Sequence, residues 1–142
     1  MCGRYASSRR PEDLAEEFEI DEASVKETVA EPLPADYNVA PTKEVYAVVT
    51  RPAKEEAASG GPRQGQRQLR VLRWGLVPFW AKDPAIGNKM INARTKGIAS
   101  KPTFRQWRAR VLADGFYEWQ KLERGRKQPV LIRRRDHSGR PA

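Results

Sequence analysis

The run Val45-Tyr46-Ala47-Val48-Val49-Thr50 decides the fold, because its β-branched side chains favour an extended strand. Downstream, Gln68 to Trp74 alternates apolar Leu69 and Val71 with polar neighbours, which predicts the return strand of a hairpin. The residues between the two strands, 54–68, are rich in Gly, Glu, Gln and Arg and are predicted to form a mobile loop. The centre of the chain is therefore expected to be an antiparallel hairpin.

A helix is predicted ahead of this hairpin, from Pro11 to Ile20. Proline suits the first helical position, and Glu12 and Asp13 suit the positive end of the helix dipole. After the hairpin, Met90 to Arg94 is expected to be a short buried strand or the end of one. Helices are thus expected to be few and short.

Two further hairpin signals lie in the last third of the chain. Arg110 to Ala113 and Phe116 to Gln120 flank Asp114-Gly115, a dipeptide that favours a hairpin turn. Gln128 to Arg134 predicts another strand, and the turn after it has no return strand, which leaves an unpaired edge. We expect an α+β fold of mostly antiparallel sheet. Residues 1–142 are expected to form the N-terminal portion of a single domain that is incomplete at its C-terminal end, or to depend on a second chain. The alternative is that the last dozen residues simply fray.

Basic residues dominate the chain, whose formal net charge is +9. Through Asp36 there are ten acidic and four basic residues, a net charge of −6, whereas from Tyr37 onward there are eight acidic and twenty-three basic residues, a net charge of +15. A basic body with interspersed tryptophans suggests a polyanionic partner, most simply nucleic acid. The alternative is a solvated cationic surface that keeps the protein soluble.

Several classes of protein are excluded by composition. Cys2 is the only cysteine and His137 the only histidine, so an intrachain disulfide and a site rich in cysteine or histidine ligands for a metal are both excluded. No apolar run is long enough to cross a bilayer, and the charged N-terminal region does not resemble a signal peptide. We therefore expect a cytoplasmic monomer with no metal, no cofactor and no membrane contact.

The motif Met1-Cys2-Gly3-Arg4-Tyr5 carries the most specific chemistry. Initiator methionine is usually removed before a small side chain, which would leave Cys2 with a free α-amine beside its thiol. Such a 1,2-aminothiol attacks an aldehyde first as an amine, giving a Schiff base, and then as a thiol, closing a thiazolidine ring. Nearby Arg4 favours the thiolate, and the amine can act as a base for its own side chain. The alternative is a cysteine whose position near the terminus is incidental.

Four further motifs follow in a fixed order: Asn38-Val39-Ala40-Pro41, Trp74-Gly75-Leu76-Val77-Pro78-Phe79-Trp80, Asn92-Ala93-Arg94 and Asp114-Gly115-Phe116-Tyr117-Glu118-Trp119. Together with the N-terminal motif, their order and content resemble the SRAP family, the SOS response-associated peptidase-like proteins that shield abasic sites. The resemblance runs from residue 1 to about residues 128–129. It implies a barrel-like antiparallel core with short helices.

The resemblance also implies a function. SRAP proteins bind single-stranded DNA at an abasic site, and Cys2, freed by a suggested autoproteolytic removal of Met1, would form a thiazolidine crosslink with the ring-opened sugar. By position, Asn92 would hold the sugar and Glu118 would assist ring opening and Schiff-base chemistry. The other matched residues would contact DNA, with Arg4, Asn38 and Arg94 gripping flanking phosphates and Pro41, Trp80 and Trp119 packing against bases.

Elementary chemistry supports these roles and offers plainer alternatives. Opening a cyclic hemiacetal needs a proton shuttle, which the Glu118 carboxyl can supply, although a strand glutamate more often faces solvent. The amide of Asn92 must find partners, and these can be atoms of its own backbone. Trp80 and Trp119 can stack on bases, at ~1–3 kcal/mol each, or can pack in the core, as we expect of Trp74.

Two features depart from the family pattern, and two other functions stay open. Nothing corresponds to the histidine of a later His-Asp-Arg-like motif, and Lys96 stands where family members often carry an acidic residue.

An N-terminal-cysteine glutamine amidotransferase also begins Met-Cys-Gly, but no glycine-rich oxyanion segment follows. A non-covalent single-stranded nucleic-acid-binding module would leave Cys2 incidental, so that Cys2→Ala would keep its DNA affinity and no covalent product would form.

Overall fold

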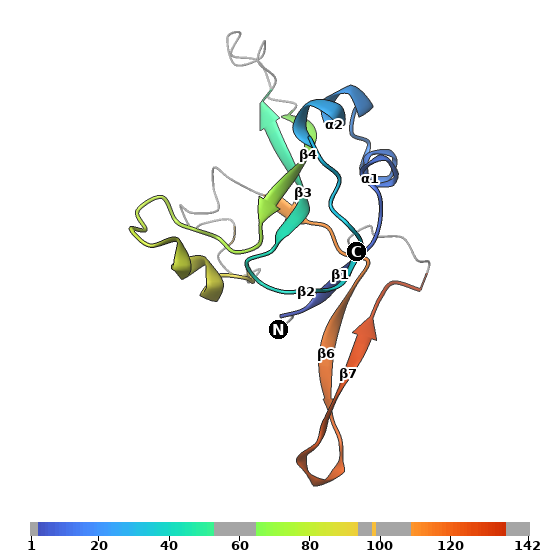
Figure 1. Cartoon of the computed structure of the whole chain (residues 1–142), viewed down its shortest axis with the longest axis vertical. Helices are drawn as coiled ribbons and strands as arrows, with labels where there is room; N and C mark the ends of the chain where they lie inside the picture. The colour runs from blue at the N-terminus through green and yellow to red at the C-terminus, as the bar shows by residue number, and fades with distance from the viewer. Residues whose placement is uncertain (1–2, 53–64, 94–97, 99–108, 136–142) are drawn as a thin grey trace.

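Two antiparallel sheets and a few short helices make up the computed structural model, which describes residues 3–52, 65–93, 98 and 109–135 (Figure 1). The strand order is β2-β1-β6-β7 in the first sheet and β4-β3-β5 in the second. Every strand pair is antiparallel, which confirms the predicted α+β class. None of the helices in these residues is both long and apolar enough to cross a bilayer.

The elements follow one another in this order: β1 (Tyr5–Ser7), α1 (Pro11–Phe18), α2 (Glu22–Thr28), β2 (Asp36–Val39), β3 (Glu44–Pro52), β4 (Gly65–Arg73), the 3-10 helix η1 (Pro84–Lys89), β5 (Ala109–Val111), β6 (Gly115–Lys121), the 3-10 turn η2 (Glu123–Gly125) and β7 (Lys127–Ile132).

The strand predicted from the central apolar run is β3, which lies between β4 and β5. Its side chains from Val45 to Val48 are all buried. Because successive side chains of a strand point to opposite faces, β3 is covered on both faces, as a continuous apolar run favours. Its pairing with β4 runs from Glu44↔Arg73 to Pro52↔Gly65, which confirms the hairpin. β4 takes in the last four residues of the predicted loop, and residues 53–64 lie outside the described part of the chain.

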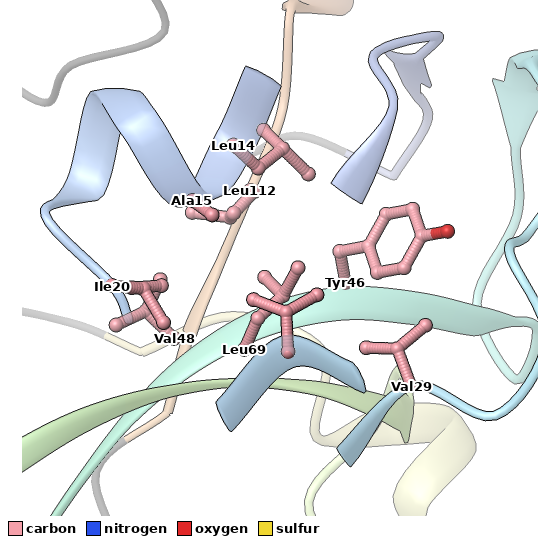
Figure 2. Close-up of a cluster of buried hydrophobic side chains, with 9 residues drawn as sticks. Leu14, Ala15, Ile20, Val29, Tyr46, Val48, Leu69 and Leu112 are labelled. Carbon is pink, nitrogen blue, oxygen red and sulfur yellow. The ribbon is translucent and has the colours of Figure 1, made fainter. Parts of the chain in front are cut away.

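One face of β3 and β4 is covered by the two helices (Figure 2). Helix α1 begins at Pro11 and ends two residues before its predicted end, and its apolar side turns Leu14 toward Tyr46 and Leu69 of the sheet. The Tyr46 hydroxyl oxygen accepts a hydrogen bond from Leu33 N at 2.6 Å. This bond fixes the extended segment that leads to β2.

A second cluster of buried side chains connects the two sheets. Tyr5 of β1 and Val39 of β2 pack with Val45 of β3 and with Trp74, which follows β4. The Tyr5 and Trp74 rings meet edge to face, with their centroids 5.0 Å apart and their planes at 72°. Trp74 is thus a core residue, as predicted, and the N-terminal strand is anchored to the body of the protein.

The predicted hairpin at Asp114-Gly115 is wrong, because the strands on either side of it belong to different sheets. The Asp114 carboxylate instead accepts hydrogen bonds from Ser8 N at 2.6 Å, from Ser8 Oγ at 2.8 Å and from Arg9 Nε at 2.8 Å. The dipeptide therefore marks the point where the chain crosses from one sheet to the other. The strand predicted at Met90 is also wrong, since η1 and an irregular segment occupy this region as far as Ala93.

Candidate nucleic-acid site

The residues that follow Cys2 run along the middle of the first sheet, although Cys2 itself lies outside the described residues. Tyr5 pairs with Phe116 of β6 and with Val39 of β2. One residue earlier, the Arg4 carbonyl accepts a hydrogen bond from Tyr117 N at 2.9 Å. The chain is therefore held on β6 up to Arg4, whose side chain is half-buried.

Pairing register sets which face of this sheet each predicted side chain occupies. Tyr5, Val39 and Phe116 are direct partners, so they share a face, and two of them belong to the buried cluster between the sheets. This is the inner face. Because side chains alternate along a strand, Arg4 and Asn38 point to the outer face.

Strand β6 divides the remaining predicted residues between the two faces. Glu118 shares the inner face with its partner Val130, whereas Trp119 shares the outer face with its partner Pro129. Glu118 is half-buried, and the Trp119 side chain is 56% exposed. The outer face thus brings together Arg4, Asn38 and Trp119, three of the predicted DNA-contacting residues.

Asn38 and Pro41 are positioned by a turn that carries its own ion pair. The Asp36 carboxylate accepts from Asn38 N at 2.8 Å and from Lys43 Nζ at 2.6 Å. Trp74 fixes the end of this turn, since its carbonyl accepts from Thr42 N and its amide donates to the Lys43 carbonyl, both at 2.9 Å. Asn38 is exposed and Pro41 is half-buried, so both side chains reach solvent at this turn.

The hydrogen bond from Lys43, joined by that from Asn38 N, lowers the pKa of Asp36 below its usual range. A carboxylate with a depressed folded-state pKa stabilises the protein above its unfolded pKa, and this contribution is lost as the pH falls through the folded pKa. We expect Lys43→Met to lower the free energy of unfolding by about 0.5 kcal/mol near pH 7, because the pair is partly exposed. The difference from the unmodified protein should vanish on acidification.

Urea unfolding at neutral pH and again below the pKa of Asp36 measures this effect. Lys82→Met removes an exposed lysine of the loop after β4 and serves as the control for the change in net charge. A Lys43→Met defect that stays constant over the whole pH range would contradict the role given to Asp36.

The motif from Trp74 to Trp80 and the predicted catalytic Asn92 lie in one loop that folds back on itself. The loop is closed by hydrogen bonds from Leu76 N to the Met90 carbonyl and from Trp74 Nε1 to the Ile91 carbonyl, both at 3.0 Å. Its exposed surface includes Phe79, 93% exposed, and Trp80, 61% exposed. Trp80 is therefore available for stacking rather than part of the core.

Asn92 lies in the irregular segment that follows η1. It follows Ile91, which packs with Tyr5 and Trp74 in the cluster between the sheets, and its own side chain is exposed. Arg94 lies outside the described residues.

Sequence reasoning missed one residue that shapes this site. The Tyr117 hydroxyl donates a hydrogen bond to the Tyr37 carbonyl at 2.8 Å, which ties β6 to β2 across the outer face, next to Asn38. No periodicity in the sequence singles out this contact, because it joins residues 80 positions apart. Tyr37, 66% exposed, and Phe79 are further exposed aromatic side chains.

Tyr117→Phe is expected to lower the free energy of unfolding by about 0.5–1 kcal/mol, because it removes this hydrogen bond and leaves the ring in place. Amide exchange at Asn38 should also become faster. Denaturant unfolding and hydrogen exchange measure the two effects. Tyr37→Phe is the matched control, since it removes a neighbouring hydroxyl and keeps the carbonyl that accepts the bond. Equal unfolding free energies and equal amide exchange in the two variants would contradict the role given to the Tyr117 hydrogen bond.

No group of three or more His, Cys, Asp or Glu side chains that could hold a metal ion occurs in residues 3–52, 65–93, 98 and 109–135.

Comparison with known families gives one match along nearly the whole chain. A family model described as SOS response associated peptidase (SRAP) matches residues 1–140. The match includes all five motifs that the sequence analysis singled out.

Similar proteins occur in bacteria and vertebrates. The abasic site processing protein YoaM of Bacillus subtilis is 38% identical over 137 residues, which cover 94% of this chain and 53% of YoaM. The abasic site processing protein YedK of Escherichia coli is 32% identical over 140 residues, which cover 96% of this chain and 55% of YedK. The abasic site processing protein HMCES of Xenopus tropicalis is 27% identical over 147 residues, which cover 93% of this chain and 42% of HMCES. The chain thus spans about half the length of the curated relatives it matches.

Proposed function

The chain belongs to the SOS response associated peptidase (SRAP) family, and we propose that it recognises abasic sites in single-stranded DNA and captures them covalently through Cys2. The observation that carries this proposal is the pairing of Arg4 with Tyr117, the residue before Glu118. If the same register continues for one residue, Gly3 lies opposite Glu118. The N-terminal end of the chain would then be directed toward a carboxyl group on the inner face.

The reaction needs no external oxidant or reductant. Hydrolysis of the Met1–Cys2 peptide bond frees the α-amine. This amine adds to the aldehyde carbon of the ring-opened sugar, and the resulting carbinolamine loses water to give a Schiff base. The Cys2 thiolate then adds to the same carbon, and the nitrogen takes up a proton as the thiazolidine ring closes. Capture of one abasic site therefore releases one water molecule.

Glu118 and Asn92 are proposed to serve the sugar. The Glu118 carboxyl would move a proton between the ring oxygen and the hydroxyl of the closed sugar, and would protonate the departing water of the carbinolamine. The amide of Asn92 would hold the sugar hydroxyl groups by hydrogen bonds. Glu118 lies on the face of β6 that Phe116 shares with Tyr5, and Ile91, the neighbour of Asn92, packs against the buried cluster that contains Tyr5.

The outer face and the loop after β4 are proposed to hold the DNA on either side of the lesion. Arg4 and Asn38 would contact phosphates, together with Arg94. Pro41, Trp80 and Trp119 would pack against bases, which is supported by the exposure of both tryptophan rings.

A denaturing gel tests the covalent step. The purified chain is incubated with a single-stranded oligonucleotide that carries one abasic site, beside an intact strand of the same sequence. The proposal expects a product that survives boiling in detergent with the abasic strand only. Its mass should equal that of DNA plus protein, less Met1 and one water molecule. A gel without that product would overturn the proposal for this chain.

A non-covalent single-stranded DNA-binding module is the second candidate. The exposure of Phe79 and Trp80 on one loop favours it, because exposed aromatic rings bind bases irrespective of sequence. This function predicts equal affinity for the intact and abasic strands and no product on the denaturing gel.

Arg4→Ala is expected to weaken reversible binding to single-stranded DNA and to make it less sensitive to salt. Loss of one phosphate contact lowers the slope of log affinity against log salt by about 0.7 for a single strand. Fluorescence anisotropy at several salt concentrations gives the slope. Arg110→Ala, an equal charge change on β5 of the other sheet, is the matched control. If both variants lower the slope equally, Arg4 acts through net charge alone.

A further inference from the structure

The end of the β6–β7 hairpin carries a dense positive charge. The hairpin projects from the rest of the protein (Figure 1), and every residue from Trp119 to Ile132 is exposed. Residues 121–127 hold four lysines and arginines against one acidic residue, Glu123. A cationic arm therefore extends away from the buried clusters.

Two of these cations stand directly opposite each other, Lys121 on β6 and Lys127 on β7. Leu122 N donates to the Arg126 carbonyl at 2.8 Å, so the next pair toward the tip is a hydrogen-bonded one. Because the two kinds of pair alternate along an antiparallel ladder, the lysines form a non-hydrogen-bonded pair, in which Cα atoms are only about 4.5 Å apart. Like charges directly opposite one another destabilise a strand pair, and a polyanion bound over them would offset that repulsion.

The lysine pair lies on the same face as a predicted base-stacking residue. Two residues back along β6, Trp119 pairs with Pro129, and side chains two residues apart on a strand point to the same side. Arg4, whose carbonyl accepts from Tyr117 N, lies on this outer face a further two residues back. The outer face thus presents a guanidinium, an indole ring and two ammonium groups in that order, over about 14 Å of strand.

Single-stranded nucleic acid fits this order of groups, because proteins bind it with aromatic rings on which bases stack and with cations that follow the backbone. Lysines on an exposed hairpin can also keep a strand edge from pairing with other chains. Protection of an edge sets no preference for one face of the sheet. The position of both lysines on the face that carries Trp119 therefore favours nucleic acid.

We propose that Lys121 and Lys127 bind adjacent phosphates of the DNA strand next to the nucleotide whose base packs on Trp119, so that the hairpin lengthens the DNA site beyond the lesion. This inference rests on the proposed function, which assigns Trp119 to base packing. Each ammonium group donates hydrogen bonds to phosphate oxygens. The strand length of about 14 Å corresponds to about four nucleotides at the B-form rise of ~3.4 Å per phosphate, and to fewer in an extended strand.

Reversible binding at several salt concentrations tests the arm. Lys121→Gln/Lys127→Gln is made in the Cys2→Ala protein, which leaves binding reversible, and fluorescence anisotropy is measured with an abasic single strand that has long flanks. Loss of two phosphate contacts should lower the slope of log affinity against log salt by about 1.4. Lys26→Gln/Arg110→Gln is the matched control, since it removes the same charge from α2 and β5 and should leave the slope unchanged.

Strand length locates the contact. Two further abasic strands end directly at the lesion, one on its 5′ side and one on its 3′ side. The difference between the lysine variant and its parent should vanish with one of these strands and persist with the other. Circular dichroism of all variants shows that they remain folded, as expected for exposed positions.

Equal slopes for the two double variants, or a difference that neither shortened strand removes, overturn the proposal. Self-association of the lysine variant in sedimentation velocity, with an unchanged slope, would also overturn it and would identify the lysines as protection of a strand edge. A denaturing gel with Cys2 intact separates this inference from the proposed function. If crosslinking fails in the unmodified protein, the proposed function fails while the slopes can still be compared; a normal product together with equal slopes removes only the arm.

Discussion

Replacing Cys2 with alanine is expected to abolish the detergent-stable product between this protein and abasic single-stranded DNA. Alanine leaves the α-amine in place once Met1 is removed, so a Schiff base with the aldehyde can still form. Without the thiol, no ring can close on the imine carbon, and water reverses the Schiff base during denaturation. Reversible affinity for the same strand should stay close to that of the unmodified protein, because phosphate and base contacts come from other residues. A denaturing gel and anisotropy measure the two quantities.

Sodium borohydride separates the two stages of this reaction. Hydride reduces the imine of Cys2→Ala to a stable secondary amine, so the variant should give a gel product only when borohydride is present. A variant that retains Met1 should give no product without borohydride, since its thiol is no longer on the terminal residue and no thiazolidine ring can close. A stable product from Cys2→Ala without reduction would show that another nucleophile captures the sugar.

Sequence patterns predicted the elements whose signals are local. α1 begins at Pro11, where a proline and two acidic residues favour a helix start, and β3 and β4 coincide with apolar patterns typical of strands. Helix α2 was not predicted, because its seven residues are mostly polar and bury only Ser24 and Val25. Such a helix owes its stability to packing on the sheet rather than to its own sequence.

Long-range packing overrode the turn signal at Asp114-Gly115. The dipeptide has the local preferences of a hairpin turn, but the Asp114 carboxylate binds Ser8 and Arg9 at the end of β1 instead. These partners lie more than 100 residues away in the chain, so no local rule finds them. The crossing at this point is what places β6, with Glu118 and Trp119, beside the N-terminal strand.

The sequence motifs identified the candidate site residues, but only the pairing register of the strands shows which face of the sheet each residue occupies. Glu118 and Trp119 are neighbours in sequence and were assigned to catalysis and to base packing. Their positions on opposite faces of β6 support different partners for the two side chains. Trp74 and Trp80 belong to the same motif, yet one is buried and the other is exposed, because the chain folds back at Gly75 between them.

Gly75→Ala is expected to lower the free energy of unfolding by about 3 kcal/mol, through backbone strain of ~1–2 kcal/mol and a steric clash of ~1–3 kcal/mol. Gly75 has a φ of 132°, and a Cβ built on it would lie 2.5 Å from the Gly87 carbonyl oxygen. Gly87 cannot move away freely, because it is buried and a Cβ on it would already contact Val77 at 3.1 Å. The clash should therefore open the loop that carries Trp80 and Asn92.

Gly125→Ala separates the two causes. Gly125 also has a positive φ, 74°, but a Cβ there would meet nothing within 4 Å, so only backbone strain of about 1–2 kcal/mol is expected. Urea unfolding of the two variants should therefore differ by the cost of the clash. Gly75→Ala should also lose DNA binding under conditions where it is still folded, since the loop presents Trp80 from the same turn, whereas Gly125→Ala should retain it. If the two alanine variants proved equally stable and equally active, the close approach of Gly75 to Gly87 would not be what shapes this loop.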